Sequence, residues 1–375
     1  MGSIASFSHV RRPAECPKFI IPISVFSCLY AAYALVRRLF DSFNSHVLAF
    51  AYALKVLIPI IIRTGRRPVV FSRYTGMGDI ICTVPAARQL MQRHAGTTFI
   101  YNCHRNFAEL PRIAGVADQV TSLKSIGQIG HWYRFLLGGF YDFAHGDDVP
   151  GRTAREPMVA DFCRQFEVAI TDQHPELAAS PEATARARRI LIGKGLDLSD
   201  LILIHPGPSW AIKEWPRELW MQLVAGLRSR GHTQIAHLGV GNYAHIGQTT
   251  VAAIPGTISL VDCLSIEECI AAISLARLVV GIDSGLLHIA ASTRTPAVGL
   301  FGPTDPQFFY EPEARRQFVR TEVECAGCEH RRPRLHWLMG CPYNVKCMQS
   351  IDVEQVLQKC LECLKTAEPS AAGSM

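Results

Sequence analysis

The sequence predicts an α/β protein with two successive arrays of parallel strands and helices. Apolar, β-branched runs that suit strands buried on both faces recur at residues 68–74, 201–207 and 276–280. Each run is followed by a polar turn that contains glycine and then by a helical pattern, which is typical of nucleotide-binding folds. A stretch rich in Pro, Asp and Gln at residues 171–182 predicts a linker between the two arrays.

The length of the chain allows two domains of this kind. At 375 residues it exceeds the usual size of one domain. With the predicted linker, we expect Rossmann-like domains at residues 67–180 and 181–365, after an apolar helical extension at residues 1–66.

The stretch at residues 281–306 contains the most informative turn. Asp283, Ser284 and Gly285 follow the strand at residues 276–280, where open α/β sheets bind ligands and where helix N–H groups favour anions. His288 lies four residues beyond Ser284 and therefore projects from nearly the same side of the helix. Asp283 or Ser284 could instead only cap this helix.

A second glycine turn follows the strand at residues 68–74. Gly76 and Gly78 let the backbone approach a ligand closely, although a G-x-G alone is weak evidence because the complete dinucleotide fingerprint is absent. Asp79 comes directly after this turn and could accept a proton from a bound hydroxyl group. The alternative is that Asp79 is the N-cap of the next helix.

The loop after the strand at residues 201–207 carries a lysine, Lys213, between Trp210 and Trp215. A lysine that leaves the carboxyl end of a strand can neutralise a phosphate as a point charge. The alternative is a solvated surface lysine.

The N-terminal segment is strongly apolar. The whole chain is 49% hydrophobic and only 19% charged, and residues 19–36 carry no charge. A second apolar run at residues 47–62 is interrupted by Lys55 and followed by Arg63. We expect membrane attachment, by one span plus an interfacial helix, a shallow hairpin, or two helices on an anionic leaflet. The alternative is a helical pair buried against the body of the protein.

Charge and cysteine content exclude two other classes of protein. The formal net charge of +6 is modest and no Lys/Arg tract is interleaved with aromatic residues, so we expect no nucleic-acid partner. Most of the 13 cysteines are scattered singly, unlike those of a secreted disulfide scaffold. Cys325, Cys328, Cys341 and Cys347 form a cluster that could hold a structural zinc ion, or could be thiols without metal, because their spacing is not that of a standard zinc finger.

Three segments resemble glycosyltransferase family 9, the ADP-heptose:lipopolysaccharide heptosyltransferases and their relatives. These segments are TGMGDIICTVP at residues 75–85, HPGPSWAIKEWP at 205–216 and GIDSGLLHIAASTRTPAVGLFGPTDP at 281–306. The resemblance covers residues 68–356. It implies a GT-B fold, in which two Rossmann-like domains face a cleft and the second domain holds the nucleotide sugar.

The resemblance also implies roles for individual residues. Asp79 matches the family's proposed general base, and Gly76 and Gly78 lie on the acceptor side. The residues that match donor contacts are Ser209, Lys213, Asp283, Ser284, Gly285, Leu286 and His288. The family's glutamate that holds the nucleoside is replaced by a segment with Asn242 and no carboxylate nearby in the sequence.

We therefore expect an inverting glycosyltransferase of lipopolysaccharide biosynthesis at the cytoplasmic face of the inner membrane. It would transfer a heptose-like sugar from a nucleotide diphosphate donor to a lipopolysaccharide or other lipid-linked glycan acceptor, with no cofactor required. The main alternative is a degenerate, non-catalytic nucleotide-sugar-binding protein tethered to the membrane. A nucleotide-dependent dehydrogenase is disfavoured because neither array has a complete dinucleotide fingerprint.

Overall fold

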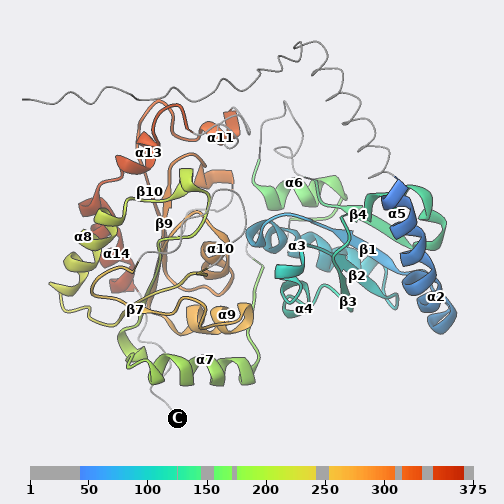
Figure 1. Ribbon diagram of the computed structural model, residues 1–375, viewed down its shortest axis with the longest axis horizontal. Coiled ribbons are helices and arrows are strands. Elements are labelled where there is room, and N and C mark those ends of the chain that lie inside the picture. Colours follow the sequence, from blue (N-terminus) through green and yellow to red (C-terminus); the bar gives the residue numbers. More distant parts are fainter. Residues whose placement is uncertain are drawn as a thin grey trace, which may run out of the picture.

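The computed structural model contains two parallel β-sheets with helices packed around them (Figure 1). It describes residues 43–124, 126–144, 156–170, 175–241, 253–308, 315–331 and 341–366. The apolar run at residues 19–36, Asn242 and part of the expected linker lie outside the described residues.

The first sheet has four strands in the order β3-β2-β1-β4, all parallel. The strands are β1 (Val69–Ser72), β2 (Phe99–Asn102), β3 (Gln119–Thr121) and β4 (Gly139–Asp142). Successive residues of a strand point to opposite faces. Val69 and Phe71 of β1 join one buried apolar cluster, whereas Val70 joins another with Ile100 of β2. Both faces of this sheet are therefore covered.

Helices cover the two faces of the first sheet. They are α3 (Met77–Arg93), α4 (Leu110–Ile113), α5 (Ile126–Trp132) and α6 (Met158–Gln165). A 3₁₀ turn, Arg134–Leu136, follows α5.

The second sheet has six parallel strands in the order β10-β9-β8-β5-β6-β7. The strands are β5 (Ile202–His205), β6 (Ile235–His237), β7 (Ile258–Ser259), β8 (Leu278–Ile282), β9 (Ala297–Phe301) and β10 (Arg316–Arg320). Counted from β5, this is the order 3-2-1-4-5-6 of a complete Rossmann fold. The chain order reverses between β5 and β8.

The helices of the second half begin at recognisable caps. They are α7 (Pro181–Gly193), α8 (Arg217–Arg228), α9 (Ile266–Leu275), α10 (Gly285–Ser292), α11 (Cys328–Arg331), α13 (Lys346–Gln349) and α14 (Val353–Thr366). Ser180 caps α7, with Pro181 in its first turn, and Ser265 and Glu268 form a capping box on α9. Cys360 and Cys363 of α14 are fully buried, as packed thiols.

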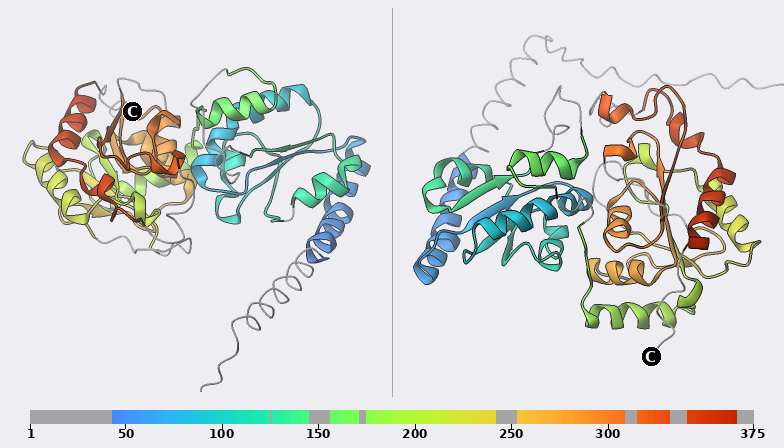
Figure 2. Two further views of the ribbon diagram at one scale, coloured as in Figure 1. Left: turned by 90° about the horizontal axis from the view of Figure 1, so that it is seen from above. Right: turned by 180° about the vertical axis from the view of Figure 1, so that it is seen from behind.

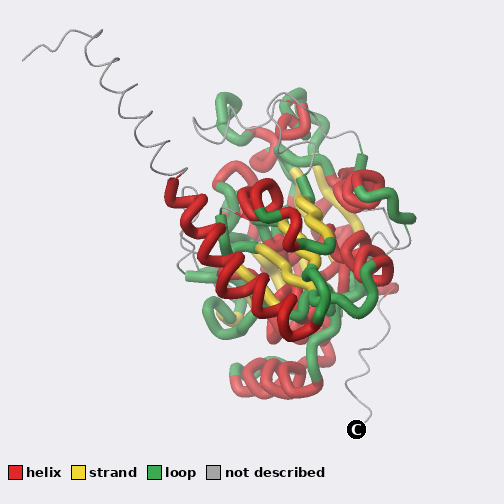
Figure 3. Tube along the Cα trace, turned by 90° about the vertical axis from the view of Figure 1, so that its right-hand side faces the viewer, coloured by secondary structure: helices red, strands yellow, loops and turns green. Residues whose placement is uncertain are grey.

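The N-terminal helix (Phe43–Thr64) forms a layer of the first domain and is not detached from it. It contains a π-helical turn, Ala53–Leu57, followed by α2 (Ile58–Thr64), and ends at Gly65, whose φ of 67° suits a glycine. Figure 3 shows it crossing the outside of the first domain. One side of this helix packs on β1 and β2, so the buried-helix alternative holds for that side. The domain boundary at residue 66 remains a prediction.

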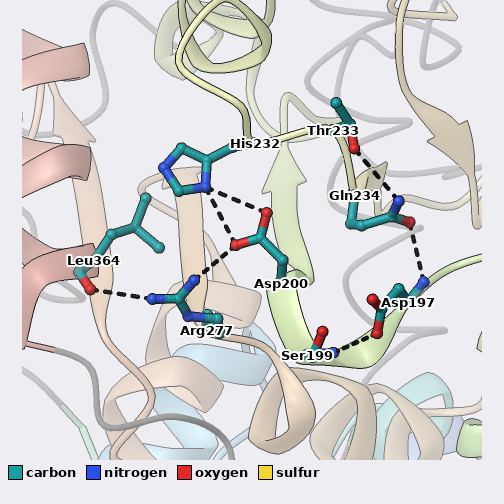
Figure 4. A network of polar contacts seen from close by, with 8 residues as sticks. All are labelled: Asp197, Ser199, Asp200, His232, Thr233, Gln234, Arg277 and Leu364. Atoms are coloured by element: carbon teal, nitrogen blue, oxygen red, sulfur yellow. Dashed lines mark hydrogen bonds and ion pairs between the residues drawn. The ribbon is translucent and has the colours of Figure 1, made fainter.

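A polar network ties together the amino ends of the strands in the second sheet (Figure 4). Asp200, before β5, accepts hydrogen bonds from Arg277 Nη1 at 2.7 Å and faces His232 Nδ1 at 3.2 Å. Arg277 Nη2 also donates to the carbonyl of Leu364 at the end of α14, at 3.3 Å. These contacts brace the end of the sheet that lies away from the ligand turns, which follow the carboxyl ends of the same strands.

Candidate functional site

The loops that follow β1, β5 and β8 converge between the two sheets. Each leaves its strand at the point where the sheet order changes direction, which is where doubly wound folds bind ligands. Figures 1 and 2 show α3 and α10, the helices that follow two of these loops, lying side by side between the sheets. Buried apolar residues of both helices, such as Ile80 and Ile289, belong to one cluster. The expected site is therefore assembled at the boundary of the two halves.

Two glycines make this close approach possible. A Cβ atom on Gly78 would lie 2.3 Å from Cδ2 of His288, and one on Gly285 would lie 2.5 Å from Cε of Met77. Both positions must lack a side chain, because a helix from the other half of the protein occupies the space that a Cβ atom would take. Gly78, expected on the acceptor side, thus contacts the predicted donor turn, whereas Gly76 is the exposed N-cap of α3.

Asp283 and Lys213 form a largely buried ion pair between the loops that follow β5 and β8, at the switch point where the strand order of the second sheet reverses. Lys213 Nζ donates to Oδ2 of Asp283 at 2.7 Å, and the Thr304 hydroxyl donates to the same oxygen at 2.8 Å. Nζ also lies 4.9 Å from the centre of the Trp210 ring and 3.9 Å from Oε2 of Glu329. Asp283 therefore holds the lysine rather than capping α10, and Lys213 is not a solvated surface lysine.

Ser284 occupies the N-cap position of α10 but makes no side-chain cap hydrogen bond. Its Oγ is buried and has no hydrogen-bond partner among the described residues. A buried hydroxyl without a partner is costly, and one beside free helix N–H groups is placed to bond an anion. The capping alternative for Asp283 and Ser284 is wrong for both residues.

Asp79 is the third residue of α3; it lies in the first turn of the helix and is not its N-cap. Arg73, which follows β1, is 4% exposed; its guanidinium donates to the Phe143 carbonyl at 2.7 Å and to Oδ2 of Asp79 at 3.2 Å. The Asp79 side chain keeps 27% of its surface exposed, so it remains reachable by a substrate. Arg73 was not among the predicted site residues: its position directly after a buried strand was a usable signal, but its contact with Phe143 is not visible in the sequence.

Charges at the site shift the pKa values of its groups. Burial acts to raise the pKa of Asp79, but Arg73, the Thr75 hydroxyl, His288 and Lys213 outweigh it and lower the pKa below its ordinary value. Asp79 is therefore ionised at neutral pH.

The donor-side groups are held in fixed charge states. Burial acts to lower the pKa of Lys213, but Asp283 and Glu329 raise it above its ordinary value. Burial likewise acts to raise the pKa of Asp283, yet Lys213 lowers it. Burial lowers the pKa of His288 despite both nearby carboxylates, and its Nδ1 lies 3.7 Å from the Cys82 thiol. The pair is thus charged while the imidazole is neutral at pH 7.

The remaining expected donor residues occupy peripheral places. Ser209 lies on the loop after β5, where its backbone N–H donates to Glu214 Oε1 at 3.3 Å. Leu286 is partly buried against the apolar cluster. Near the end of β6, both carboxylate oxygens of Asp262 accept from the N–H of Gly241, at 3.0 and 3.1 Å. The sequence has no carboxylate next to Asn242, but the chain after β7 brings the Asp262 carboxylate to Gly241 in the folded protein.

The cysteine segment supports the turn after β9 and does not form a recognised metal site. A Cβ on Gly302 would lie 2.9 Å from Sγ of Cys347, and the N–H of Glu329 donates to the Pro303 carbonyl at 2.9 Å. Burial raises the pKa of Cys328 to about 11 and that of Cys347 to about 12. Among the described residues, no group of three or more His, Cys, Asp or Glu side chains is arranged to hold a metal ion. The zinc site expected at Cys325, Cys328, Cys341 and Cys347 is not supported.

The contact between α3 and α10 predicts a specific stability effect. Gly78→Ala should destabilise the protein by about 1–3 kcal/mol, because the new methyl group overlaps the His288 ring. Thermal unfolding measures this as a lower midpoint. Gly193→Ala is the matched control, since a Cβ there meets no atom within 4 Å and alanine is the better helix former. An unchanged midpoint in Gly78→Ala would contradict the contact, and His288→Ala in the same chain should relieve the loss.

Comparison with known sequences agrees with this arrangement. The family description "Glycosyltransferase family 9 (heptosyltransferase)" matches residues 134–338, more than half of the chain. Lipopolysaccharide heptosyltransferase 1 of Pseudomonas aeruginosa is 26% identical over an alignment of 314 residues; the alignment covers 69% of this chain and 85% of that protein. The protein of the same name from Escherichia coli K12 is 22% identical over an alignment of 283 residues, which covers 64% of this chain and 88% of that protein.

Solved structures share the fold. A glycosyltransferase family 9 protein of Veillonella parvula superposes with a TM-score of 0.57 at 15% identity, covering 80% of this chain and 97% of that one. The ADP-heptose lipopolysaccharide heptosyltransferase II of E. coli gives a TM-score of 0.56 at 15% identity, over 80% and 99% of the two chains. The arrangement of two facing Rossmann-like sheets is the GT-B fold. The chain belongs to glycosyltransferase family 9 and is a glycosyltransferase.

Proposed function

We propose that this glycosyltransferase moves a heptose-like sugar from a nucleotide diphosphate donor to a lipopolysaccharide-type acceptor, with inversion at the anomeric carbon. One observation carries the proposal: α3, which bears Asp79, packs directly against α10, which begins beside Asp283 and its ion pair with Lys213. The relatives named lipopolysaccharide heptosyltransferase supply the substrate class.

Lys213 and the start of α10 form the donor half of the proposed site. The Ser284 hydroxyl and the first N–H groups of α10 would bond the diphosphate, and Lys213 would neutralise it. This charge would stabilise the diphosphate as it leaves the sugar, the part that a metal ion plays in other transferases. Asp283 would keep the lysine in place before the donor arrives, since the two are already paired.

Asp79 forms the acceptor half. Its carboxylate would take the proton from the acceptor hydroxyl as that oxygen attacks the anomeric carbon and the diphosphate departs from the opposite face. Single displacement inverts the anomeric configuration. Arg73 would keep Asp79 ionised and turned toward the boundary between the two halves. A non-catalytic binding protein would not need the Asp79 carboxylate beside the donor-side ion pair, so the geometry favours the catalytic interpretation.

The carboxylate of Asp262 is a candidate contact for the nucleoside of the donor. It lies at the end of β6, the second strand of the Rossmann order, where such folds commonly place an acidic residue against the ribose. It would take the place of the glutamate that the family resemblance implies near Asn242.

A lipid-linked acceptor places the proposed reaction at a membrane surface, on the cytoplasmic face. The N-terminal helix (Phe43–Thr64) is long and apolar enough to cross a membrane, and 22% of an apolar 18-residue stretch of it is buried inside the protein. Incubation with ADP-heptose and a heptose-deficient lipopolysaccharide tests the proposed function, because transfer adds the mass of one heptose to the acceptor. The absence of any transfer, with donor bound, would contradict the acceptor assignment.

Substitution of the base should separate chemistry from binding. Asp79→Asn should lower turnover by about 10²–10⁴-fold, because an amide cannot accept the acceptor proton. Donor affinity, measured by calorimetry, should stay close to wild type. Glu182→Gln is the control, an equivalent change on α7 away from the site. Near-normal turnover of Asp79→Asn would exclude Asp79 as the base.

Two donor-side substitutions should weaken binding of nucleotide diphosphates. Ser284→Ala should lower affinity several-fold while leaving the unfolding midpoint unchanged, because its hydroxyl has no protein partner among the described residues to lose. Lys213→Ala should lower affinity by about 10–100-fold, the value of one charged hydrogen bond. Lys194→Ala, at the end of α7, is the control. Wild-type affinity in both donor-side variants would refute the donor assignment.

The pH profile should report on Arg73. Asp79 acts as a base only when ionised, so activity falls as the pH drops through its pKa. Without the guanidinium, burial is less opposed, so Arg73→Gln should raise the pKa of Asp79 and move this acidic limb of turnover to higher pH. Arg73→Lys keeps the charge and should restore most of the profile. An acidic limb that does not move would show that Arg73 has no effect on the base.

A further inference from the structure

The N-terminal helix has two apolar sides, and only one of them is covered by the protein. Ala49, Ala53, Leu57 and Ile60 are buried on the first sheet, against side chains that include Val70. The exposed large apolar side chains of the helix are Phe43, Val47, Leu48, Phe50, Leu54 and Ile62, which are 48–78% exposed. A surface of this kind on a soluble protein marks an interaction site.

Two aromatic residues of the neighbouring segment extend this surface. Trp132, at the end of α5, is 55% exposed, and its ring centre lies 5.6 Å from that of His46 on the helix. Phe135, in the following 3₁₀ turn, is 64% exposed. We call these two residues and the exposed apolar residues of the helix the outer face. Figures 2 and 3 show that the helix lies on the outside of the first domain, away from the second domain.

Within the described segments that form the outer face, residues 43–67 and 126–136, every Asp, Glu, Lys or Arg position is basic. Lys55, Arg63, Arg66, Arg67 and Arg134 are exposed on or beside the same segments. The sequence has no Asp or Glu between residues 42 and 78 or between residues 119 and 141. Basic side chains with long apolar stems can lie along an apolar surface and place their charge at lipid phosphates. A tryptophan at the edge of the apolar area suits the boundary between headgroups and acyl chains.

We propose that the outer face docks on an anionic lipid bilayer, with the N-terminal helix in the membrane plane and its other side still on the first sheet. A spanning helix would have to leave the sheet and expose Val70, Ile100 and the other side chains that it covers. It would also place Lys55, near the middle of the helix, at the centre of the bilayer. In-plane docking keeps the packed side intact and lets Lys55 reach the headgroups.

The chain that leads into this helix agrees with a lipid partner. Residues 19–36, which precede Phe43 by six intervening residues, contain no charged residue. A second membrane-seeking segment in the same chain would raise the effective concentration of the outer face at the same bilayer. The outer face is a property of the first domain and does not depend on the identity of the sugar or the acceptor, so it extends beyond the proposed function.

Fluorescence quenching of Trp132 in the full chain tests the proposal locally. The protein is mixed with phosphatidylcholine vesicles, with or without phosphatidylglycerol, that carry bromine at shallow or deep acyl positions. The difference between wild type and Trp132→Phe isolates the signal of this residue among the five tryptophans. We expect Trp132 to be quenched most by shallow bromine and more strongly in the anionic vesicles. This readout does not depend on whether residues 19–36 also bind lipid.

Variants of the outer face complete the test. Leu54→Glu should weaken the affinity for vesicles about tenfold, because it removes an apolar contact and adds repulsion to anionic lipid. The affinity is measured from Trp132 quenching as the lipid concentration is raised. Ile192→Glu is the matched control: Ile192 is 56% exposed on α7 of the second domain, and its loss should leave quenching unchanged. Equal unfolding midpoints without lipid would show that both variants are folded.

Three results would overturn the proposal. One is the absence of Trp132 quenching in both kinds of vesicle, and another is strongest quenching by deep bromine, which indicates insertion across the bilayer. The third is a concentration-dependent dimer in light scattering that Leu54→Glu dissociates, which would make a second copy the partner. Donor binding measured without lipid tests the proposed function separately. A failure of the lipid-docking proposal therefore leaves the proposed function intact, and the reverse also holds.

Discussion

The buried pair of Lys213 and Asp283 is the interaction on which the site depends. Two charges taken out of water are costly unless each is paired and hydrogen-bonded, and here Thr304 supplies a further bond to the carboxylate. The pair joins the loops after β5 and β8, the two strands between which the sheet order reverses. It therefore joins these two loops and holds a cation against Asp283, the residue before Ser284, whose hydroxyl has no hydrogen-bond partner among the described residues.

Arg73 has two opposing effects on Asp79, the other carboxylate of the proposed site. Arg73 keeps Asp79 ionised, and the same interaction makes Asp79 a weaker base than an isolated carboxylate. Such a base works best when the sugar bond is largely broken before the proton moves, because the acceptor hydroxyl is then more acidic. The charges on the donor side, which favour departure of the diphosphate, fit that order of events. The two halves of the site are thus matched in chemistry as well as in position.

Much of this arrangement follows from the sequence, and the remainder depends on contacts between distant residues. The strands β5 and β8 were predictable because continuous β-branched runs suit a buried parallel sheet. Asp79, Lys213 and the turn at Asp283 were found because each follows such a strand. Arg73 was missed because its partner Phe143 is 70 residues away, and Asp262 because only the folded chain brings it to Gly241. An apolar helix does not reveal from its sequence which side will be covered.

Strand β1 connects the outer face to Asp79, the proposed base. Val70 packs toward the N-terminal helix, whereas Val69 and Phe71 pack with α3 on the opposite face of the sheet. Arg73 leaves the end of this strand and holds Asp79 on the first turn of α3. A close-packed sheet deforms little. Docking of the helix on a bilayer would therefore fix the distance and direction of Asp79 from the membrane surface, which is what attack by a lipid-linked hydroxyl requires.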